Sequence, residues 1–451
     1  MQNLRSPLKL ILLISVSACG GGGGDGGSGG GDVDSGEVLF SQMTTVPSDV
    51  RMISYPDFYQ TPPSGDVTVV DPYCSLTWDI VTYPTSYLGE FPMPPVQGAP
   101  LLASIRRGVA VKDYWDYGLT NPSTNEGCTG DLHTAFIATL ERLVRLGADH
   151  VIIFRDTELV DINAPTLQFR PWASWAISDS ELSWIVAQAN TFGLKVHEYR
   201  QVTNIDSNGV MLSNTPTLAW MTKYLDAYIP YIVDRAQVAE QNGVEAFELD
   251  WGVYWWGDWT PERVALFNSK MTEAAQQVRG VYSGIILSGQ IASWTYDQML
   301  LNNIDWFIGD LFSNINVDST ENANLSVTML KAKYLDRMSN LANAHGPSKK
   351  PVVWQVFAQS HRDYLLIHWI EDGFCVNNCM QNSLQTDFSV QAIQYEAMLE
   401  AIAEQTHFVT ASVDAKSYWF VDVILPRDSF PNISQSPRNK PAESILYEWF
   451  K

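Results

Sequence analysis

The sequence predicts an α/β fold in which eight parallel strands close into a (β/α)8 barrel, preceded by an N-terminal irregular or β-rich cap. From about residue 104 onward, short apolar runs typical of buried strands alternate with amphipathic stretches typical of helices. Near-continuous apolar strands indicate a parallel sheet covered by helices. Eight such units in one chain fit a closed barrel better than an open, doubly wound sheet.

The chain begins with features of an exported protein. Arg5 and Lys9 precede the apolar run 10–16, which is too short to span a bilayer and is typical of a secretory signal over residues 1–18. The tetrapeptide Val16-Ser17-Ala18-Cys19 resembles the lipobox of bacterial lipoproteins, which implies that Cys19 is lipidated. An ordinary signal peptide is the alternative.

The segment that follows predicts a flexible tether over residues 19–37, because ten of the twelve residues 20–31 are Gly. We therefore expect a location in the bacterial cell envelope, lipid-anchored on the outer membrane or cell surface, or secretion. The lipid anchor is the only membrane contact that we expect. Residues 38–103, rich in Pro and Tyr, are interpreted as a cap segment packed on the barrel, which occupies 104–451.

Four cysteines remain after the leader, and an even number in an exported chain favours disulfides. We predict a local bridge between Cys375 and Cys379, and a second bridge between Cys74 and Cys128. A zinc site is the alternative, but no His lies at a ligand spacing from either pair. The sequence therefore predicts neither a metal site nor an organic cofactor.

The barrel elements follow one another in a regular order. The predicted strands are 108–111, 151–154, 194–199, 244–250, 284–287, 304–310, 351–357 and one near 417–423. The predicted helices between and after them are 133–146, 180–192, 218–242, 261–278, 296–301, 323–344, 390–404 and 441–450. The run Ser178-Asp179-Ser180-Glu181 is typical of a helix start, as is Pro261 in a first turn.

Composition excludes several classes of partner. The chain has 451 residues, with 28 Lys and Arg against 50 Asp and Glu, a formal net charge of −22. That excess of negative charge repels phosphate backbones and anionic lipid heads, so we expect no nucleic-acid partner. Hydrophobic residues at 45% and aromatic residues at 12% exclude a disordered chain. We expect a monomer.

Acidic residues recur where the predicted strands end, and these ends form the active-site face of such barrels. Buried unpaired carboxylates are costly, so packing alone does not require them. Alternation places Glu248 and Asp250 on the same side of strand four, with Asp310 after strand six. Paired carboxylates serve glycoside hydrolysis, so these three are the candidate catalytic residues. The alternative for Glu248 is a structural pair with Arg155 or Arg200.

Further polar and aromatic residues at the same end predict a carbohydrate-binding surface, because indole faces stack on sugar rings. A partner-protein surface could use Trp in the same way. The candidate substrate-binding residues are Trp115, Asp156, Glu198, Arg200, Trp251, Trp255, Trp256, Trp294 and Gln355. His197 could be a metal ligand, but it lacks partners at ligand spacing and is interpreted as a hydrogen-bonded structural residue.

The segments 108–117, 178–197, 236–243, 276–284 and 436–443, in that order, resemble barrel glycoside hydrolases of the family 113 endo-β-mannanase type. This resemblance implies an acid/base Glu after strand four and a nucleophilic Glu at the end of strand seven. Gln355 stands where that second Glu is expected, and an amide cannot act as a carboxylate nucleophile. The chemistry has then moved to other acids, or the barrel binds sugar without cleaving it.

The run 247–252 is also similar to the strand-four motif of retaining α-glycosidase clans. This similarity implies that Asp250 is the nucleophile and that Asp310 is the proton donor, with Glu248 as a third acid. We therefore predict a lipoprotein glycoside hydrolase acting on a polysaccharide or oligosaccharide, with retention or inversion left open. The alternatives are a non-catalytic carbohydrate-binding lipoprotein and a scaffold lipoprotein that contacts a partner protein.

Overall fold

The structure is a computed structural model of the 451-residue chain. It describes residues 67–72, 78–83, 85–94, 100–112, 132–164, 166–170, 177–202, 206, 210, 216–249, 259–288, 302–311, 315–345, 350–367, 385–419, 435–438 and 440–451.

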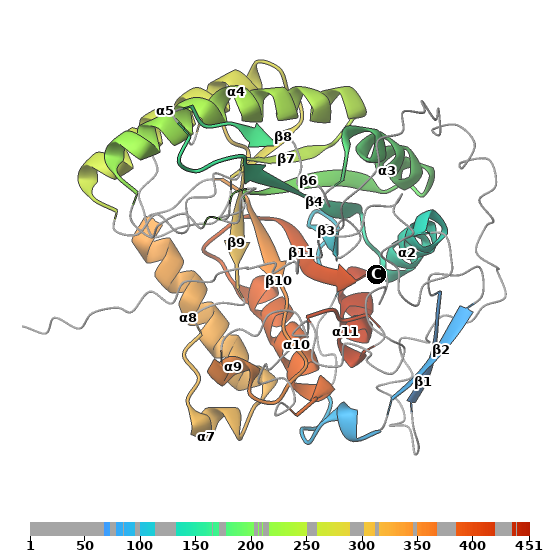
Figure 1. The fold of residues 1–451 in the computed structure, drawn as a ribbon. Coiled ribbons are helices and arrows are strands. Elements are labelled where there is room, and N and C mark those ends of the chain that lie inside the picture. The colour runs from blue at the N-terminus through green and yellow to red at the C-terminus, as the bar shows by residue number, and fades with distance from the viewer. Residues whose placement is uncertain are drawn as a thin grey trace, which may run out of the picture.

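Eight parallel strands form a closed barrel at the centre of the molecule (Figure 1). Pairing proceeds around the barrel in chain order, and the last strand pairs with the first, which leaves no open edge. The predicted closed barrel is therefore confirmed. The strands are β3 (Arg106–Lys112), β4 (His150–Leu159), β6 (Lys195–Val202), β7 (Ala246–Leu249), β8 (Ile285–Ser288), β9 (Trp306–Asp310), β10 (Val352–Val356) and β11 (Thr410–Trp419).

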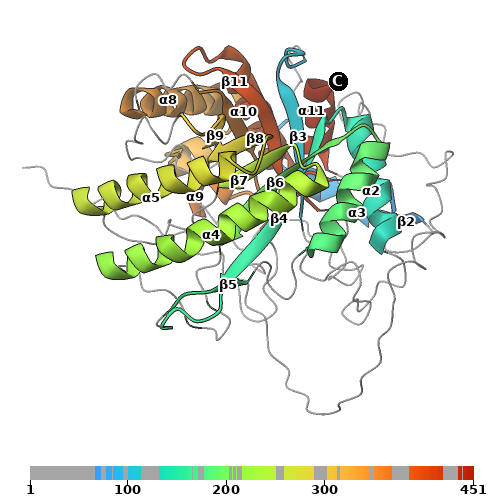
Figure 2. The same ribbon diagram turned by 90° about the horizontal axis from the view of Figure 1, so that it is seen from above.

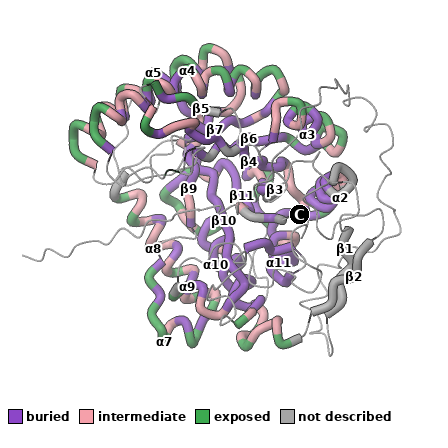
Figure 3. Tube along the Cα trace, viewed as in Figure 1, coloured by how far each residue is buried: buried purple, intermediate pink, exposed green. Residues whose placement is uncertain are grey.

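Helices surround the barrel. Most of them bury an inner face against it and expose an outer face, whereas the helices Phe388–Glu404 and Pro441–Phe450 are buried on nearly all sides (Figure 3). Seen from above, α4 (Leu218–Asn242) and α5 (Pro261–Arg279) lie side by side on one flank (Figure 2). The longer helices are α2 (Leu132–Leu146), α3 (Asp179–Thr191), α4 (Leu218–Asn242), α5 (Pro261–Arg279), α8 (Val327–His345), α10 (Phe388–Glu404) and α11 (Pro441–Phe450). The shorter elements are α7 (Ser319–Asn322), α9 (Tyr364–Ile367), the 3-10 helix η2 (Thr85–Leu88) and the strand β5 (Phe169–Arg170), which pairs antiparallel with β4.

Local sequence signals set several helix boundaries. The side chain of Ser178 accepts the N–H of Glu181, whose carboxylate in turn accepts the N–H of Ser178, which completes the capping box at the start of α3. Thr260 caps α5 ahead of Pro261, which occupies the first turn as expected. The predicted short helix at 296–301 lies outside the described residues.

The predicted position of strand eight was wrong by several residues. We expected it near 417–423, whereas β11 begins at Thr410 and ends at Trp419. The polar side chains of Ser412 and Asp414 alternate with apolar ones that face the helices, so this stretch does not form a continuous apolar run. Both polar residues are fully buried inside the barrel, which the apolar pattern of strands one to seven did not suggest.

Part of the predicted cap segment lies against the barrel. The ring of Tyr87 contacts that of Phe388 at the start of α10, with centroids 6.0 Å apart. Glu90 forms an ion pair with Arg362 at 2.6 Å. Gly89 has a φ of +97°, and a Cβ there would collide with Asp387, so the close approach requires glycine. The strands β1 (Val67–Pro72) and β2 (Trp78–Tyr83) form an antiparallel pair.

Among the described helices, none has a stretch that is both long and apolar enough to cross a membrane.

The last helix is joined to the first barrel helix by a buried ion pair. Nε and Nη2 of Arg142 in α2 donate to the two carboxylate oxygens of Glu443 in α11, at 2.8 and 2.5 Å. Neither side chain is more than 1% exposed. Tyr418 donates a further hydrogen bond to Glu443. The ion pair therefore connects helices α2 and α11, which lie far apart in the sequence.

We predict that Glu443→Gln lowers the free energy of unfolding by about 3–5 kcal/mol, because it removes the negative charge that pairs with the buried Arg142 guanidinium through both carboxylate oxygens. Urea denaturation measures this loss. The control is Glu448→Gln in the same helix, which removes a partly exposed pair with Lys451 and should change stability by less than about 1 kcal/mol. Similar losses in the two variants would contradict this account of the ion pair.

Candidate active site

Side chains of alternate strand residues face the barrel interior. Tyr199 on β6 donates a hydrogen bond to Oδ2 of Asp414 on β11 at 2.6 Å, although β6 and β11 are not neighbours in the sheet. This contact therefore crosses the interior and identifies which face of each strand points inward. Because paired residues in a parallel sheet share a face, the strand registers then place Glu248, Asp310 and Gln355 inside the barrel.

Glu248, one of the three candidate catalytic residues, is buried near the carboxyl end of β7. Its Oε2 accepts the backbone N–H of Arg200 on β6 at 3.1 Å. Burial raises the pKa of the Tyr199 hydroxyl well above its usual value, with further contributions from Asp414 and Glu248. Tyr199 is therefore a neutral hydrogen-bond donor beside two carboxylates.

Asp310, the second candidate, is the last residue of β9. Burial raises the pKa of its carboxyl group, and the positive charges of Lys416 and Arg337 partly oppose this rise. Arg337 on α8 donates to the backbone carbonyl oxygen of Asp310 from Nε and Nη2, at 3.1 and 2.9 Å, which fixes the end of the strand. An acid with a raised pKa beside cations can hold a proton and then release it.

Gln355 on β10 lies between these groups. It is the register partner of Asp310 on one side and of Asp414 on the other. Its side chain is buried and hydrogen-bonds Tyr199. The amide therefore belongs to the polar interior of the barrel rather than to its apolar shell.

Lys416 is a further inward-facing residue, and it is not among the residues predicted from the sequence. It lies at an irregularity of β11, where the register with β3 shifts between Ala415 and Tyr418. Its Nζ is 5.5 Å from the centroid of the Phe357 ring, and its charge acts on Asp310. If strand eight had been predicted at Thr410–Trp419, Lys416 would have been expected at the carboxyl end of the barrel.

Glu198 and Arg200 were expected at the substrate-binding surface, but the structure places them outside the barrel, between the strands and the helices. They flank the inward-facing Tyr199, so alternation directs both outward. Glu198 forms ion pairs with Arg155 and Arg200. Of the Arg residues considered as partners of Glu248, Arg155 forms ion pairs with Asp179 and Glu198, and Arg200 forms an ion pair with Glu198. Neither Glu198 nor Arg200 is retained as a sugar contact.

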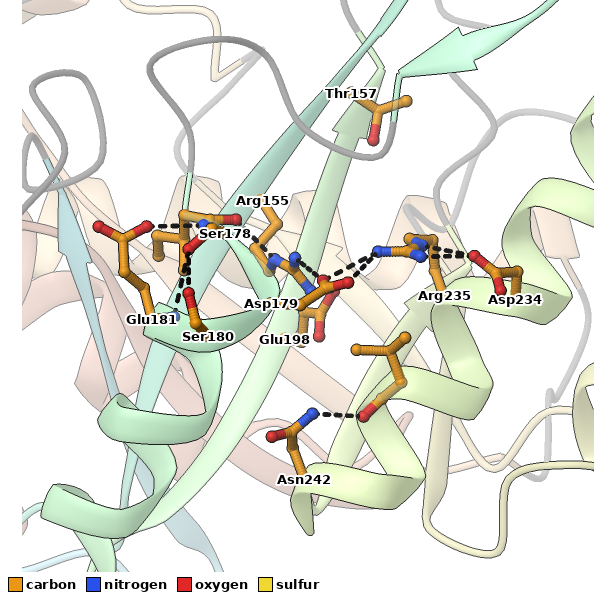
Figure 4. A network of polar contacts seen from close by, with 12 residues as sticks. Arg155, Thr157, Ser178, Asp179, Ser180, Glu181, Glu198, Asp234, Arg235 and Asn242 are labelled. Atoms are coloured by element: carbon orange, nitrogen blue, oxygen red, sulfur yellow. Dashed lines mark hydrogen bonds and ion pairs between the residues drawn. The ribbon is translucent and has the colours of Figure 1, made fainter. Parts of the chain in front are cut away.

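Arg155 and Glu198 belong to a larger polar network that includes the first residue of α3 and the second half of α4 (Figure 4). Asp179 bridges two cations, with Oδ1 2.5 Å from Arg155 Nη2 and 2.9 Å from Arg235 Nη1. Although burial alone would raise it, Arg155 and Arg235 hold the pKa of Asp179 below its usual value. The network joins α3 and α4 to the barrel and has a structural role.

Below the carboxylates, toward the amino ends of the strands, the interior remains polar. His150 and His197 stack with ring centroids 3.7 Å apart. Burial and the neighbouring His150 lower the pKa of His197 to about 3, so its ring is neutral. With Asp414, these are the described residues that could together hold a metal ion.

Several predicted site residues lie in parts of the chain that the structure does not describe. For Asp156 the structure describes the backbone but not the side chain. The catalytic candidate Asp250 follows the last described residue of β7. The remaining residues in this group are Cys19, Cys74, Trp115, Cys128, Trp251, Trp255, Trp256, Trp294, Cys375 and Cys379.

No protein-family model matches the chain, and no curated protein matches it. Among solved structures, the chain is similar to a glycoside hydrolase family 113 β-1,4-mannanase, with 17% identity and a TM-score of 0.48 over 76% of this chain and 97% of that one. It is also similar to the family 113 β-mannanase of Alicyclobacillus acidocaldarius, with 16% identity and a TM-score of 0.49 over 78% of this chain and 99% of that one. A family 5 mannosidase from Rhizomucor miehei gives 12% and a TM-score of 0.46, over 77% of this chain and 92% of that one.

We predict that the stability of the Asp310→Asn variant, relative to that of the unchanged protein, increases as the pH rises above about 4. The folded-state pKa of Asp310 lies above its unfolded value, so the stability that this group contributes is present below the unfolded pKa. It is lost as the pH rises through the folded pKa. Asparagine cannot ionise and does not incur this loss.

Urea unfolding at a series of pH values between 4 and 8 measures the difference. The control is Asp336→Asn, which removes an exposed carboxylate from α8 and should show no such gain. A stability difference between Asp310→Asn and the unchanged protein that does not vary with pH would contradict the raised pKa.

Proposed function

We propose that this protein is an extracytoplasmic glycoside hydrolase that cleaves a polysaccharide or oligosaccharide. The observation that carries the proposal is the pair Glu248 and Asp310, two carboxylic acids from separate strands that face the interior of a closed barrel at its carboxyl end. This end of the barrel is where such folds place their active sites. Carboxylate pairs in this setting serve the cleavage of glycosidic bonds.

Asp310 is assigned the role of proton donor. Burial raises the pKa of its carboxyl group, which favours the protonated form needed to protonate the leaving oxygen of the sugar. After the transfer, the positive charges of Lys416 and Arg337 stabilise the carboxylate that remains. The same cations allow the group to lose its proton without a large cost in free energy.

Asp250 is assigned the role of nucleophile or base. It is two residues beyond Glu248, so a continued strand would place it on the same inward face, nearer the mouth of the barrel. Glu248 is then a supporting acid, tied to β6 through the N–H of Arg200. A separation of about 5 Å between the carboxyl groups of Asp250 and Asp310 would give retention, and roughly 6.5–9.5 Å would give inversion.

The sequence adds two features that suit a surface enzyme acting on glycans. The Trp residues expected at the same end of the barrel would stack on sugar rings. The signal-like leader, Cys19 and the Gly-rich tether would hold the catalytic barrel outside the cytoplasm while allowing it to reach a large substrate.

We predict that Asp250→Asn and Asp310→Asn each lower the turnover of the susceptible glycan by about 10²–10⁴-fold while the barrel stays folded and binds sugar. Reducing-end release across a broad glycan panel first identifies the substrate, and isothermal titration then measures binding. Asp336→Asn on α8 is the matched control and should keep full turnover. Full activity in Asp250→Asn would contradict its assignment.

A second candidate function is carbohydrate binding without hydrolysis. The observation that favours it is Gln355, an amide at the strand-seven position, buried and hydrogen-bonded to Tyr199. A barrel that had lost a nucleophile at this position would keep its sugar-binding surface. In this case Asp310 and Glu248 would only contact sugar hydroxyl groups.

The substitution Gln355→Glu distinguishes the two candidates. If Asp250 and Asp310 perform the chemistry, the new carboxylate only adds a buried negative charge next to Asp310 and Asp414, and we predict unchanged or lower turnover. Reducing-end assays of the variant and the unchanged protein on the same glycan panel measure this. Hydrolysis that appears only in the variant would favour the binding protein.

A further inference from the structure

Three side chains of types that commonly bind metal ions meet inside the barrel. They are separate from the carboxylates that are assigned to sugar chemistry. His150 on β4, His197 on β6 and Asp414 on β11 are fully buried, and one donor atom from each lies within 4.8 Å of the other two. Gly108 on β3 makes room for them. A Cβ at that position would lie 2.2 Å from His150 Nε2 and 2.3 Å from Asp414 Oδ1, so no larger residue fits without a shift.

The two imidazole rings each have a nitrogen that the described residues leave without a hydrogen-bond partner. Nε2 of His150 lies 3.2 Å from Asp414 Oδ1, and Nε2 of His197 lies 3.1 Å from Glu245 Oε2. Nδ1 of both rings is buried, and no described group forms a hydrogen bond with either atom. Buried polar atoms are normally paired, so two orphaned ring nitrogens in one cluster point to a missing partner.

The surroundings of the cluster resemble the outer shell of a metal site. Glu245 forms a hydrogen bond with Nε2 of His197, the ring nitrogen opposite Nδ1, and also forms an ion pair with Arg106. These two contacts orient the His197 ring. Asp414 accepts hydrogen bonds from Ser412 and Tyr199, at 2.5 and 2.6 Å, which orients the carboxylate. Histidine ligands commonly have a carboxylate on their second nitrogen, as His197 has here.

We propose that His150, His197 and Asp414 bind one divalent transition-metal ion, with Zn²⁺ as the best match. Two imidazoles and one carboxylate form a ligand set that suits Zn²⁺, whereas Mg²⁺ and Ca²⁺ prefer oxygen ligands alone. Zinc–nitrogen distances of about 2.0–2.1 Å place ligand atoms roughly 3.3 Å apart, and an imidazole nitrogen binds a metal in the plane of its ring. Because the two rings are stacked with their planes 24° apart, one ring must turn out of the stack for both nitrogens to point at the ion. The ion would link β4, β6 and β11 across the interior and so stabilise the barrel.

The test is metal binding by the purified full chain after removal of metal with a chelator. We expect isothermal titration and elemental analysis to give one tightly bound Zn²⁺ per chain, a rise in melting temperature with Zn²⁺, and no rise with Mg²⁺. His150→Ala and His197→Ala should lose the bound ion. The matched control is His361→Ala, which removes another buried histidine and should still bind one Zn²⁺.

A second measurement uses the unchanged protein, so it does not depend on whether the variants fold. Anomalous diffraction from crystals grown with Zn²⁺ should show one peak between the His150 and His197 rings and Asp414. The proposal is overturned if the unchanged protein binds no stoichiometric Zn²⁺, if the anomalous peak lies elsewhere, or if His197→Ala binds the ion as tightly as the unchanged chain.

Discussion

Closure of the parallel strands, with alternation of side chains along each one, is the constraint on which the other features depend. Closure gives every strand an interior face and a face toward the helices. Alternation then separates residues that are adjacent in sequence: Tyr199 points inward, while Glu198 and Arg200 point outward into ion pairs. The same rule brings Glu248, Asp310 and Gln355 to one end of the interior, although they are far apart in the chain.

The interior of this barrel is more polar than the layers of branched apolar side chains that usually fill such folds. Burying these groups is costly unless they are paired, and the structure pairs them in a chain of contacts. It runs from Arg106 and Glu245 at the amino ends of the strands, through the stacked rings of His197 and His150, to Asp414 and Tyr199. Toward the carboxyl end, incomplete compensation of burial keeps the pKa of Asp310 raised, a property useful to a proton donor.

The sequence predicted the closed barrel, the order of its elements and helix starts such as the capping box at Ser178, because these depend on local patterns. It did not predict which strand-end residues face inward, since Glu198, Tyr199 and Arg200 form one polar run whose register is set by neighbouring strands. His197 lacked partners at any ligand spacing in the sequence. Its neighbours His150 and Asp414 come from other strands, one of which was misplaced because its inward residues are polar.

The assignment of Asp250 and Asp310 is tested most directly by a crystal structure of the Asp250→Asn protein with a bound oligosaccharide from the hydrolysed glycan. We expect the sugar to lie across the carboxyl ends of the strands, with a glycosidic oxygen within about 2.6–3.2 Å of the Asp310 carboxyl group and residue 250 beside the same sugar ring. A saccharide bound on another face, or an Asp310 side chain directed away from every glycosidic oxygen, would contradict it.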